Sequence, residues 1–348
     1  MKKVLVNSAK IAISLLILGL LAYKGWTSVR NDPAAFEKLV NEPKNWPLMG
    51  AALGVCLTAV LLTFVRWRLL VQALGMTFPL RDALRLGFVG YLFNFTLSLV
   101  GGDLIKAVAI AHRNPGRKTA AAATVVVDRM VGLYALFIVG AFASLCMDFS
   151  SLRVEDAAQV LAAQRVCQTI QVLTIIGTLG LALLLLPGLA TSPMWELLGQ
   201  IPKVGPALIS LLDAVRMYRR QPLLLGASIA MSIGTHCMYA IAIYLIALAL
   251  PGDDPSLAAN FIVAPVSMAA TAAPLPGGIG AFEATFAFMY QSLAPNGVLP
   301  VQGLVIAAAY RAITLVIALI GVVYYIADRR EVKELMNEAL EEPAVKAA

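Results

Sequence analysis

The sequence has few charged residues and little histidine or cysteine from which to build a catalytic or metal centre. Charged residues make up 14% of the 348 residues, against about 25% in a typical soluble domain. The two histidines, His112 and His236, are far apart, and the four cysteines form no Cys-x-x-Cys pair. These shortages argue against zinc, a disulfide framework or a histidine nucleophile, and we expect no cofactor. A Walker motif is also missing, so ATP is not expected to drive the protein directly.

Long hydrophobic runs are abundant instead. Hydrophobic residues make up 60% of the chain, and several runs reach the ~20 residues that cross a bilayer as a helix. We therefore predict an all-α polytopic membrane protein with a single transmembrane domain over residues 1–348, ending in a charged cytoplasmic tail at 328–348. The six predicted full spans are Ala9–Val29, Trp46–Val65, Thr119–Met147, Cys167–Leu186, Leu223–Leu250 and Gln302–Ala327.

Two further apolar regions are interrupted by residues that disfavour a continuous helix. Leu84–Ala111 contains Gly101-Gly102, and Leu257–Leu293 contains Pro274-Leu-Pro-Gly-Gly-Ile-Gly280. Proline stops a helix, and glycine weakens one. We predict that each region is a re-entrant hairpin of two half-helices.

The distribution of lysine and arginine predicts the sidedness, because these residues concentrate in cytoplasmic loops. All basic clusters face the cytoplasm only if each interrupted region returns to the side from which it entered. The first region then enters from the cytoplasm, and the second enters from outside. Both termini are then cytoplasmic. In the alternative, each region crosses as a single long helix or as two ordinary helices, and single crossings would place basic loops outside. The clusters are Lys2–Lys10, Arg66–Arg85, Arg113–Lys118, Lys203–Arg220 and Arg329–Lys333.

This topology divides the chain into two halves of opposite orientation. Each half reads span, span, hairpin, span, with repeat one at about residues 9–147 and repeat two at about 167–327. In each half a Gly-Gly pair, a carboxylate and an arginine of the following span occur in the same order. Inverted repeats of this kind are typical of transporters that hold substrate between discontinuous helices.

The two breaks have the chemistry of an anion site. A half-helix that begins inside the membrane presents free N–H groups and the positive end of its dipole. Glycine allows a phosphate to approach this backbone closely. We therefore predict that the glycines at both breaks, Gly101, Gly102, Gly277 and Gly278, contribute to substrate binding.

Five ionisable residues complete the predicted substrate site, because charges in apolar spans usually face a cavity or a partner. Arg129 and Arg311 are predicted to bind an anionic headgroup with help from Lys106, since arginine suits bidentate contact with phosphate. Asp103 and Glu283 would orient these arginines, contact a cationic part of the ligand, or titrate. The alternative is that Arg129–Asp103 and Arg311–Glu283 are structural pairs that hold the hairpins in place.

The charged residues Arg66, Arg68 and Asp128 are interpreted as structural. Arg66-Trp67-Arg68 ends the second predicted span and is interpreted as an interfacial anchor of basic and aromatic residues. Asp128 lies near the cytoplasmic end of its span and is interpreted as interfacial.

The ordered motifs resemble a known family. They are Arg66-Trp-Arg-Leu-Leu-x-x-Ala-Leu-Gly75, Gly101-Gly-Asp103, Asp128-Arg-x-x-Gly132, Pro276-Gly-Gly-x-Gly280 with Glu283, and Tyr310-Arg311. This set is similar to the membrane region of lysyl-phosphatidylglycerol synthases, the flippase-like domain superfamily. The resemblance runs from about the second predicted span to the last.

The resemblance implies a role in lipid movement. In the best-known members a soluble aminoacyltransferase domain follows and attaches lysine to phosphatidylglycerol, while the membrane region moves the product to the outer leaflet. This sequence has no room for that domain, so we expect a stand-alone member without synthase activity. Many relatives have a Ser-Pro-Gly-Gly-like second break, whereas this chain has Pro274-Leu-Pro-Gly-Gly, which leaves headgroup preference open.

We expect a multi-pass protein of the cell (cytoplasmic) membrane that acts as a lipid flippase or scramblase. Its partner would be an anionic, aminoacylated or polyprenyl-phosphate-type lipid, and not nucleic acid. Two alternatives stay open: an integral membrane transferase acting on a lipid headgroup, and an accessory subunit of a lipid-modifying enzyme. Self-association also stays open.

Overall fold

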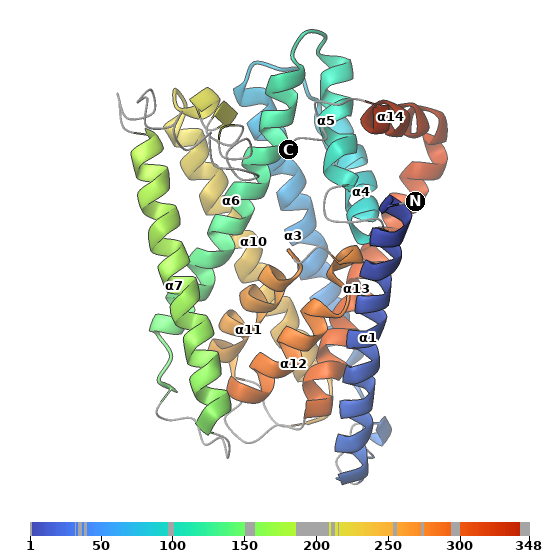
Figure 1. The fold of residues 1–348 in the computed structure, drawn as a ribbon, viewed down its shortest axis with the longest axis vertical. Helices are drawn as coiled ribbons and strands as arrows, with labels where there is room; N and C mark the ends of the chain where they lie inside the picture. Colours follow the sequence, from blue (N-terminus) through green and yellow to red (C-terminus); the bar gives the residue numbers. More distant parts are fainter. Residues whose placement is uncertain are drawn as a thin grey trace.

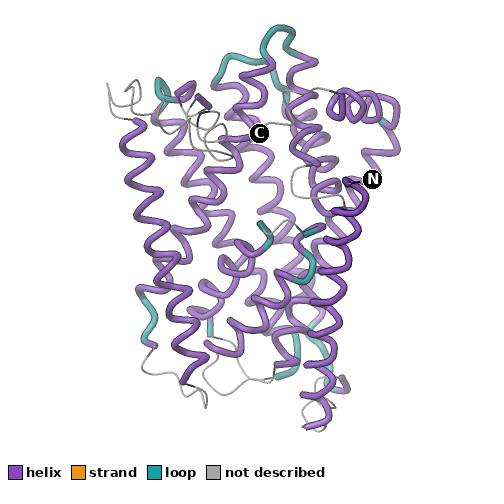
Figure 2. The backbone as a smooth tube through the Cα atoms, in the orientation of Figure 1, coloured by secondary structure: helices purple, strands orange, loops and turns teal. Residues whose placement is uncertain are grey.

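The structure is a computed structural model of the chain, and every regular element in its described part is helical (Figure 2). Residues 97–100, 186–208, 253–255, 273–274 and 294–299 lie outside the described part, so the predicted breaks are described only in part. The prediction of an all-α protein is confirmed. The described residues are 2–31, 33, 37, 40–96, 101–149, 157–185, 209, 213–214, 216–252, 256–272, 275–293 and 300–341.

Long helices form the body of the molecule (Figure 1). A helix of 28 residues is about 42 Å long, which exceeds the ~30 Å hydrocarbon core of a bilayer. In the described part, all of these helices except α1 have an apolar stretch long enough to cross a membrane, and the apolar stretch of α1 is the shorter Ala12–Thr27. The long helices are α1 (Lys2–Asn31), α3 (Trp46–Ala73), α6 (Lys118–Leu145), α7 (Ala157–Leu185), α10 (Pro222–Ala249) and α13 (Pro300–Ala327).

Three predicted spans are shorter than the helices that contain them, and the first helix begins at Lys2 rather than at Ala9. The second continues from Val65 to Ala73, and the fourth begins at Ala157 rather than at Cys167. The prediction placed the ends where the apolar runs end. Backbone hydrogen bonding carries these helices beyond the apolar runs, and in the second span the added turns pack inside the protein, with Trp67, Leu70 and Val71 buried.

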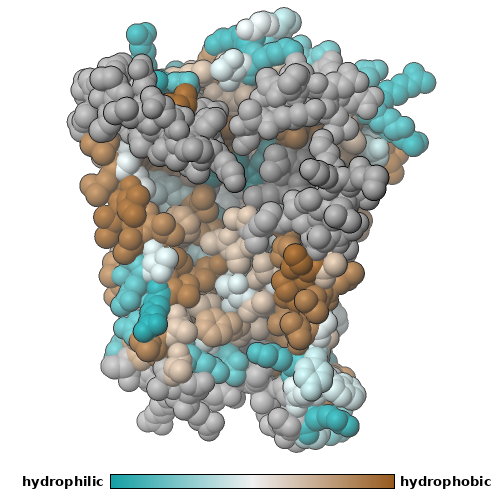
Figure 3. Space-filling model, viewed as in Figure 1, coloured by the Kyte–Doolittle hydropathy of each residue, from teal (hydrophilic) through white to brown (hydrophobic). Residues whose placement is uncertain are grey.

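Apolar side chains also cover the outside of the bundle. Residues along α7 such as Val172, Ile175, Ile176 and Leu179 are more than half exposed. Hydrophobic side chains occupy much of the middle of the face in Figure 3, and hydrophilic side chains gather toward its two ends. This surface suits a protein surrounded by lipid.

Both interrupted regions form helical hairpins, as predicted. The first consists of α4 (Leu80–Thr96) and α5 (Gly101–Arg113), and the second of α11 (Leu257–Ala270) and α12 (Ala281–Leu293). The arms of each hairpin pack against each other. Helices of 13–17 residues are about 20–25 Å long, so they are too short to cross the hydrocarbon core singly.

The hairpins enter the bundle from opposite ends and meet near its middle (Figure 1). The second hairpin turns through a short 3-10 helix, η3 (Pro276–Gly278), and α4 of the first hairpin packs against this turn. The second break is therefore in contact with α4 and α1, and membrane proteins tolerate irregular backbone where other protein covers it.

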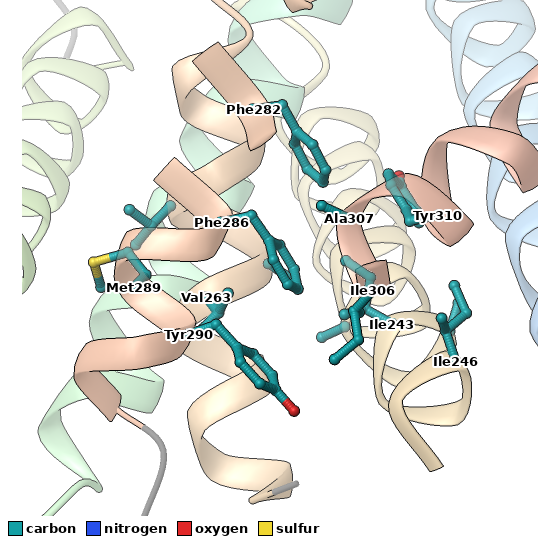
Figure 4. Packing of buried hydrophobic residues seen from close by; sticks show 14 of the residues in the cluster. Ile243, Ile246, Val263, Phe282, Phe286, Met289, Tyr290, Ile306, Ala307 and Tyr310 are labelled. Atoms are coloured by element: carbon teal, nitrogen blue, oxygen red, sulfur yellow. The ribbon is translucent and has the colours of Figure 1, made fainter. Parts of the chain in front are cut away.

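A buried aromatic column fastens the second hairpin to the bundle (Figure 4). Phe282, Phe286 and Tyr290 follow one another along α12 and face α13 and α10. The Phe282 ring stacks on the Tyr310 ring, with 5.3 Å between their centroids. Because these positions are spaced by one helical turn, they form one continuous apolar face.

The charged tail folds as a docked helix, α14 (Arg329–Glu341). Val332 and Leu335 are buried, and α14 packs against α5. Arg85 of α4 forms ion pairs with Glu331 and with Asp328, the latter with 3.2 Å between Nε and Oδ2. The tail thus contacts both arms of the first hairpin.

Candidate functional site

The second break needs glycine for its backbone conformation. Gly277, Gly278 and Gly280 have φ angles of 58°, 65° and 91°, a region that other residues rarely adopt. A Cβ on Gly278 would also lie 2.9 Å from the Cα of Thr271. The conformation turns the Gly277 and Gly278 carbonyls toward Arg311.

Arg311 of α13 clamps this break with its whole guanidinium group. Its Nε donates to Glu283 Oε1 at 2.6 Å, and its two Nη atoms donate to the carbonyls of Gly277 and Gly278, each at 3.1 Å. Glu283 Oε2 accepts from the Gly280 N–H at 2.7 Å. The two side chains are only 19% and 12% exposed. Arg311 and Glu283 thus direct their hydrogen bonds at each other and at the backbone of the break, and their charges cancel.

At the first break, glycine allows the helices α4 and α5 to approach each other closely. A Cβ on Gly102 would lie 2.0 Å from the Gly90 carbonyl oxygen of α4, so only glycine fits. The Gly102 N–H donates to Asn94 Oδ1 at 3.0 Å. Gly101 is the first residue of α5. The N–H groups of Gly102 and Gly280, which a ligand at the breaks would use, thus already have protein acceptors.

The structure pairs Asp103 with Arg129 of α6, beside the first break. Lys106 lies one turn further along α5, with 3.9 Å between its Nζ and Asp103 Oδ1. Its Nζ also lies 5.1 Å from the centre of the Trp67 ring. The Arg129 side chain is 41% exposed, more than twice the exposure of Arg311.

A second ion pair extends this group, and it corrects the interfacial roles predicted for Arg66 and Asp128. Both residues are buried. Arg66 Nε donates to Asp128 Oδ1 at 2.9 Å, Nη2 donates to the Asp128 carbonyl at 3.1 Å, and Nη1 donates to Ser232 Oγ of α10. The sequence signal was an opposite charge within each of two apolar spans. The prediction read each position alone and so missed the pair.

Asp128 and Arg129 are adjacent but serve different partners. Successive residues of a helix point about 100° apart, so the carboxylate reaches α3 while the guanidinium reaches α5. We call the five side chains Arg66, Asp103, Lys106, Asp128 and Arg129 the α5–α6 cluster. They lie near enough to act on one another electrostatically.

The two arginine–carboxylate pairs occupy equivalent positions in their helices. Asp103 and Glu283 are each the third residue of a 13-residue helix, α5 and α12. Arg129 and Arg311 are each the twelfth residue of a 28-residue helix, α6 and α13. The order expected of two repeats therefore holds at the site, with matching positions within the helices, while the repeat relationship over the whole chain stays a prediction.

The structure thus brings the predicted residues into two groups. Asp103, Lys106 and Arg129 join the α5–α6 cluster, and Glu283 and Arg311 join Gly277 and Gly278 at the second break. Within the described residues, no three His, Cys, Asp or Glu side chains are arranged to hold a metal ion.

Comparison with known proteins agrees with this architecture. No curated protein matches the chain. The protein family described as the lysylphosphatidylglycerol synthase TM region matches residues 7–321, which include both hairpins and all three arginine–carboxylate pairs of the site. The chain belongs to the lysylphosphatidylglycerol synthase TM region family.

Proposed function

We propose that this protein moves a lipid with an anionic, aminoacylated or polyprenyl-phosphate-type headgroup between the leaflets of the cell membrane. The name of its family ties such membrane regions to an enzyme of lipid headgroups. The proposal for this chain is movement of the lipid, as a flippase or scramblase, without ATP as the direct energy source.

One observation carries the proposal. Two broken hairpins from opposite ends meet near the middle of the bundle, with ionisable side chains beside both breaks. On insertion scales, placing a charged side chain at the bilayer centre costs ~3 kcal/mol or more of free energy. A charged residue at that depth therefore has a structural or a transport role. Meeting hairpins place a headgroup site at a depth that either leaflet can reach by a small movement.

The proposed mechanism is a rocking of two structural units around the breaks. One unit contains α1 to α6 and the other α7 to α13, as in the two predicted repeats, and the recurring helix lengths and charge positions support their equivalence. The headgroup would enter between the hairpins while the acyl chains stay in lipid. Lysine and arginine concentrate in cytoplasmic loops, which supports a cytoplasmic location for both termini and for the end of the bundle at which α14 lies.

A vesicle assay tests the proposal. The purified protein is reconstituted into vesicles that contain trace fluorescent phosphatidylglycerol, and a membrane-impermeant quencher reports how much of the label reaches the outer leaflet. Faster exchange than in empty vesicles is expected, and Arg129→Gln should abolish the gain. The matched control is Arg81→Gln, which removes an exposed arginine of the first hairpin.

The same preparations test the two alternatives. A new lipid species in the extract, detected by mass spectrometry, would overturn transport in favour of headgroup transfer. A second protein purifying in equal amounts, with lipid exchange only in its presence, would favour an accessory subunit. Exchange equal to that in empty vesicles for the pure, folded protein would reject the proposal.

A further inference from the structure

The two charged groups differ in their balance of charge. At the second break, Arg311 and Glu283 neutralise each other. The α5–α6 cluster contains three basic side chains, Arg66, Lys106 and Arg129, and only two acidic ones, Asp103 and Asp128. Within the described residues, therefore, the cluster has one positive charge more than it has carboxylates.

The excess charge is located at Lys106. Arg66 is bound to Asp128 and Arg129 to Asp103, which leaves Lys106 to share the Asp103 carboxylate from 3.9 Å. That separation is too long for a hydrogen bond, and Lys106 Nζ makes none within the described structure. The side chain is nonetheless only 12% exposed. An ammonium that is largely shielded from water and has no hydrogen-bonded acceptor in the described structure is costly, and an anion would relieve that cost.

The surroundings of Lys106 are shaped to hold it in this place. Gly90 of α4 leaves room for the lysine chain, because a Cβ there would lie 2.7 Å from Lys106 Cε. The face of the Trp67 ring also lies near the lysine, with its centre 5.1 Å from Nζ. Arg129, which is 41% exposed, lies within the same cluster, so an anion that reaches Lys106 also meets a partly accessible guanidinium.

We infer that the α5–α6 cluster binds a phosphate-type anion between Lys106 and Arg129, and that the Arg311–Glu283 pair is a fixed clamp outside the binding site. Substrate recognition is then confined to one half of the molecule. This inference rests on the proposed function only in assigning the phosphate to a lipid headgroup. An ammonium or choline group would add positive charge to an already cationic site, so the phosphate end of the lipid is the part recognised.

Binding can be measured without transport. Purified protein in a neutral detergent is titrated with phosphatidylglycerol, phosphatidylcholine or inorganic phosphate and followed by native mass spectrometry. We expect phosphatidylglycerol to bind in preference to phosphatidylcholine. Lys106→Met should weaken that binding about tenfold or more, since a hydrogen bond to a charged group contributes on this order. Lys333→Met, which removes the same charge from an exposed position of α14, should leave it unchanged.

Thermal unfolding without lipid separates binding from a structural role. Lys106→Met leaves the cluster with two basic and two acidic side chains, so its Tm should equal or exceed that of the wild type. Arg311→Gln should lower the Tm because it breaks the clamp. A lower Tm for Lys106→Met with unchanged lipid binding would overturn the inference.

The remaining outcomes separate this inference from the proposed function. Phosphatidylglycerol binding that is lost in Lys106→Met, in a protein that does not exchange lipid in vesicles, would uphold the site and reject transport. Lipid exchange with the same headgroup preference in wild type and Lys106→Met would uphold transport and reject the site. Binding of inorganic phosphate that phosphatidylglycerol does not displace would reject the lipid as the source of the anion.

Discussion

At the scale of single residues, the interior charges divide into those held by several partners and those held by one. Arg66 and Arg311 each direct three donors at the protein, whereas Lys106 relies on a long ion pair. Removing one partner of a buried pair leaves the other charge uncompensated, which typically costs 3–5 kcal/mol. The multiply held arginines should therefore be the more important for stability.

Asp128→Asn should destabilise the protein by about 3 kcal/mol, because it leaves the buried Arg66 without its counter-charge. Unfolding in increasing SDS, monitored by circular dichroism, measures the change. Arg81→Gln, at an exposed position, serves as the control and should shift the transition by less than about 0.5 kcal/mol. Equal transitions for the two variants would show that the Arg66–Asp128 pair contributes nothing to folding.

The clamp at the second break should behave as a coupled pair. Arg311→Gln should cost more than Glu283→Gln, because Arg311 also holds the carbonyls of Gly277 and Gly278. The double variant should cost less than the sum of the two, by about 1–3 kcal/mol, as expected for residues in contact. The same SDS unfolding series measures all three variants. Strict additivity would argue against the pair.

At the scale of elements, the first hairpin is held together by small residues and fastened by α14. Gly90 and Gly102 let α4 and α5 approach until their backbones touch, as small residues do between membrane helices. α14 adds the buried side chains Val332 and Leu335 and an ion pair from Arg85 to Glu331. Glu331 is 44% exposed, so the apolar contacts should contribute more than this charge.

Gly102→Ala should force α4 and α5 apart, because its Cβ would lie 2.0 Å from a backbone oxygen that cannot rotate away. We expect a loss of about 1–3 kcal/mol in unfolding free energy, typical of overpacking, together with loss of lipid exchange. Gly54→Ala is the matched control, since a Cβ there meets no atom within 4 Å. A Gly102→Ala protein with wild-type stability would contradict the observed helix contact.

Leu335→Ala should detach α14 from the first hairpin and cost about 3 kcal/mol, because it removes a buried leucine. Protease digestion of the intact protein should then cut within α14 well before the wild type is cut. Lys333→Ala, at an exposed position of the same helix, should leave the digestion pattern unchanged. Equal digestion of both variants would argue against docking of α14.

At the scale of the whole molecule, the two hairpins enter the bundle from opposite ends. In transporters, such an arrangement lets a central site open first to one side of the membrane and then to the other. The turn after α5 and the start of α11 should lie on opposite sides of the membrane. The charge rule assigns the α5 turn and α14 to the cytoplasm.

Labelling with a membrane-impermeant thiol reagent tests this assignment in a protein whose four cysteines are replaced by serine. Asn41→Cys and Leu257→Cys should react in intact cells, whereas Pro115→Cys and Lys333→Cys should react only after the cells are opened. All four positions are exposed. Reaction of Pro115→Cys and Leu257→Cys from the same side would exclude hairpins that enter from opposite sides.

The sequence by itself determined the helical membrane class and the two interrupted hairpins, and it offered the pairs Arg129–Asp103 and Arg311–Glu283 as one of two interpretations. These follow from local patterns: apolar run length, glycine and proline breaks, and charges within apolar spans. Only the tertiary structure decided that Arg66 pairs with Asp128, that Arg311 is committed to the carbonyls of its own break, and that Lys106 shares the Asp103 carboxylate with Arg129. Those outcomes depend on which faces of distant helices meet, and one helical step of about 100° decides which neighbour a side chain reaches.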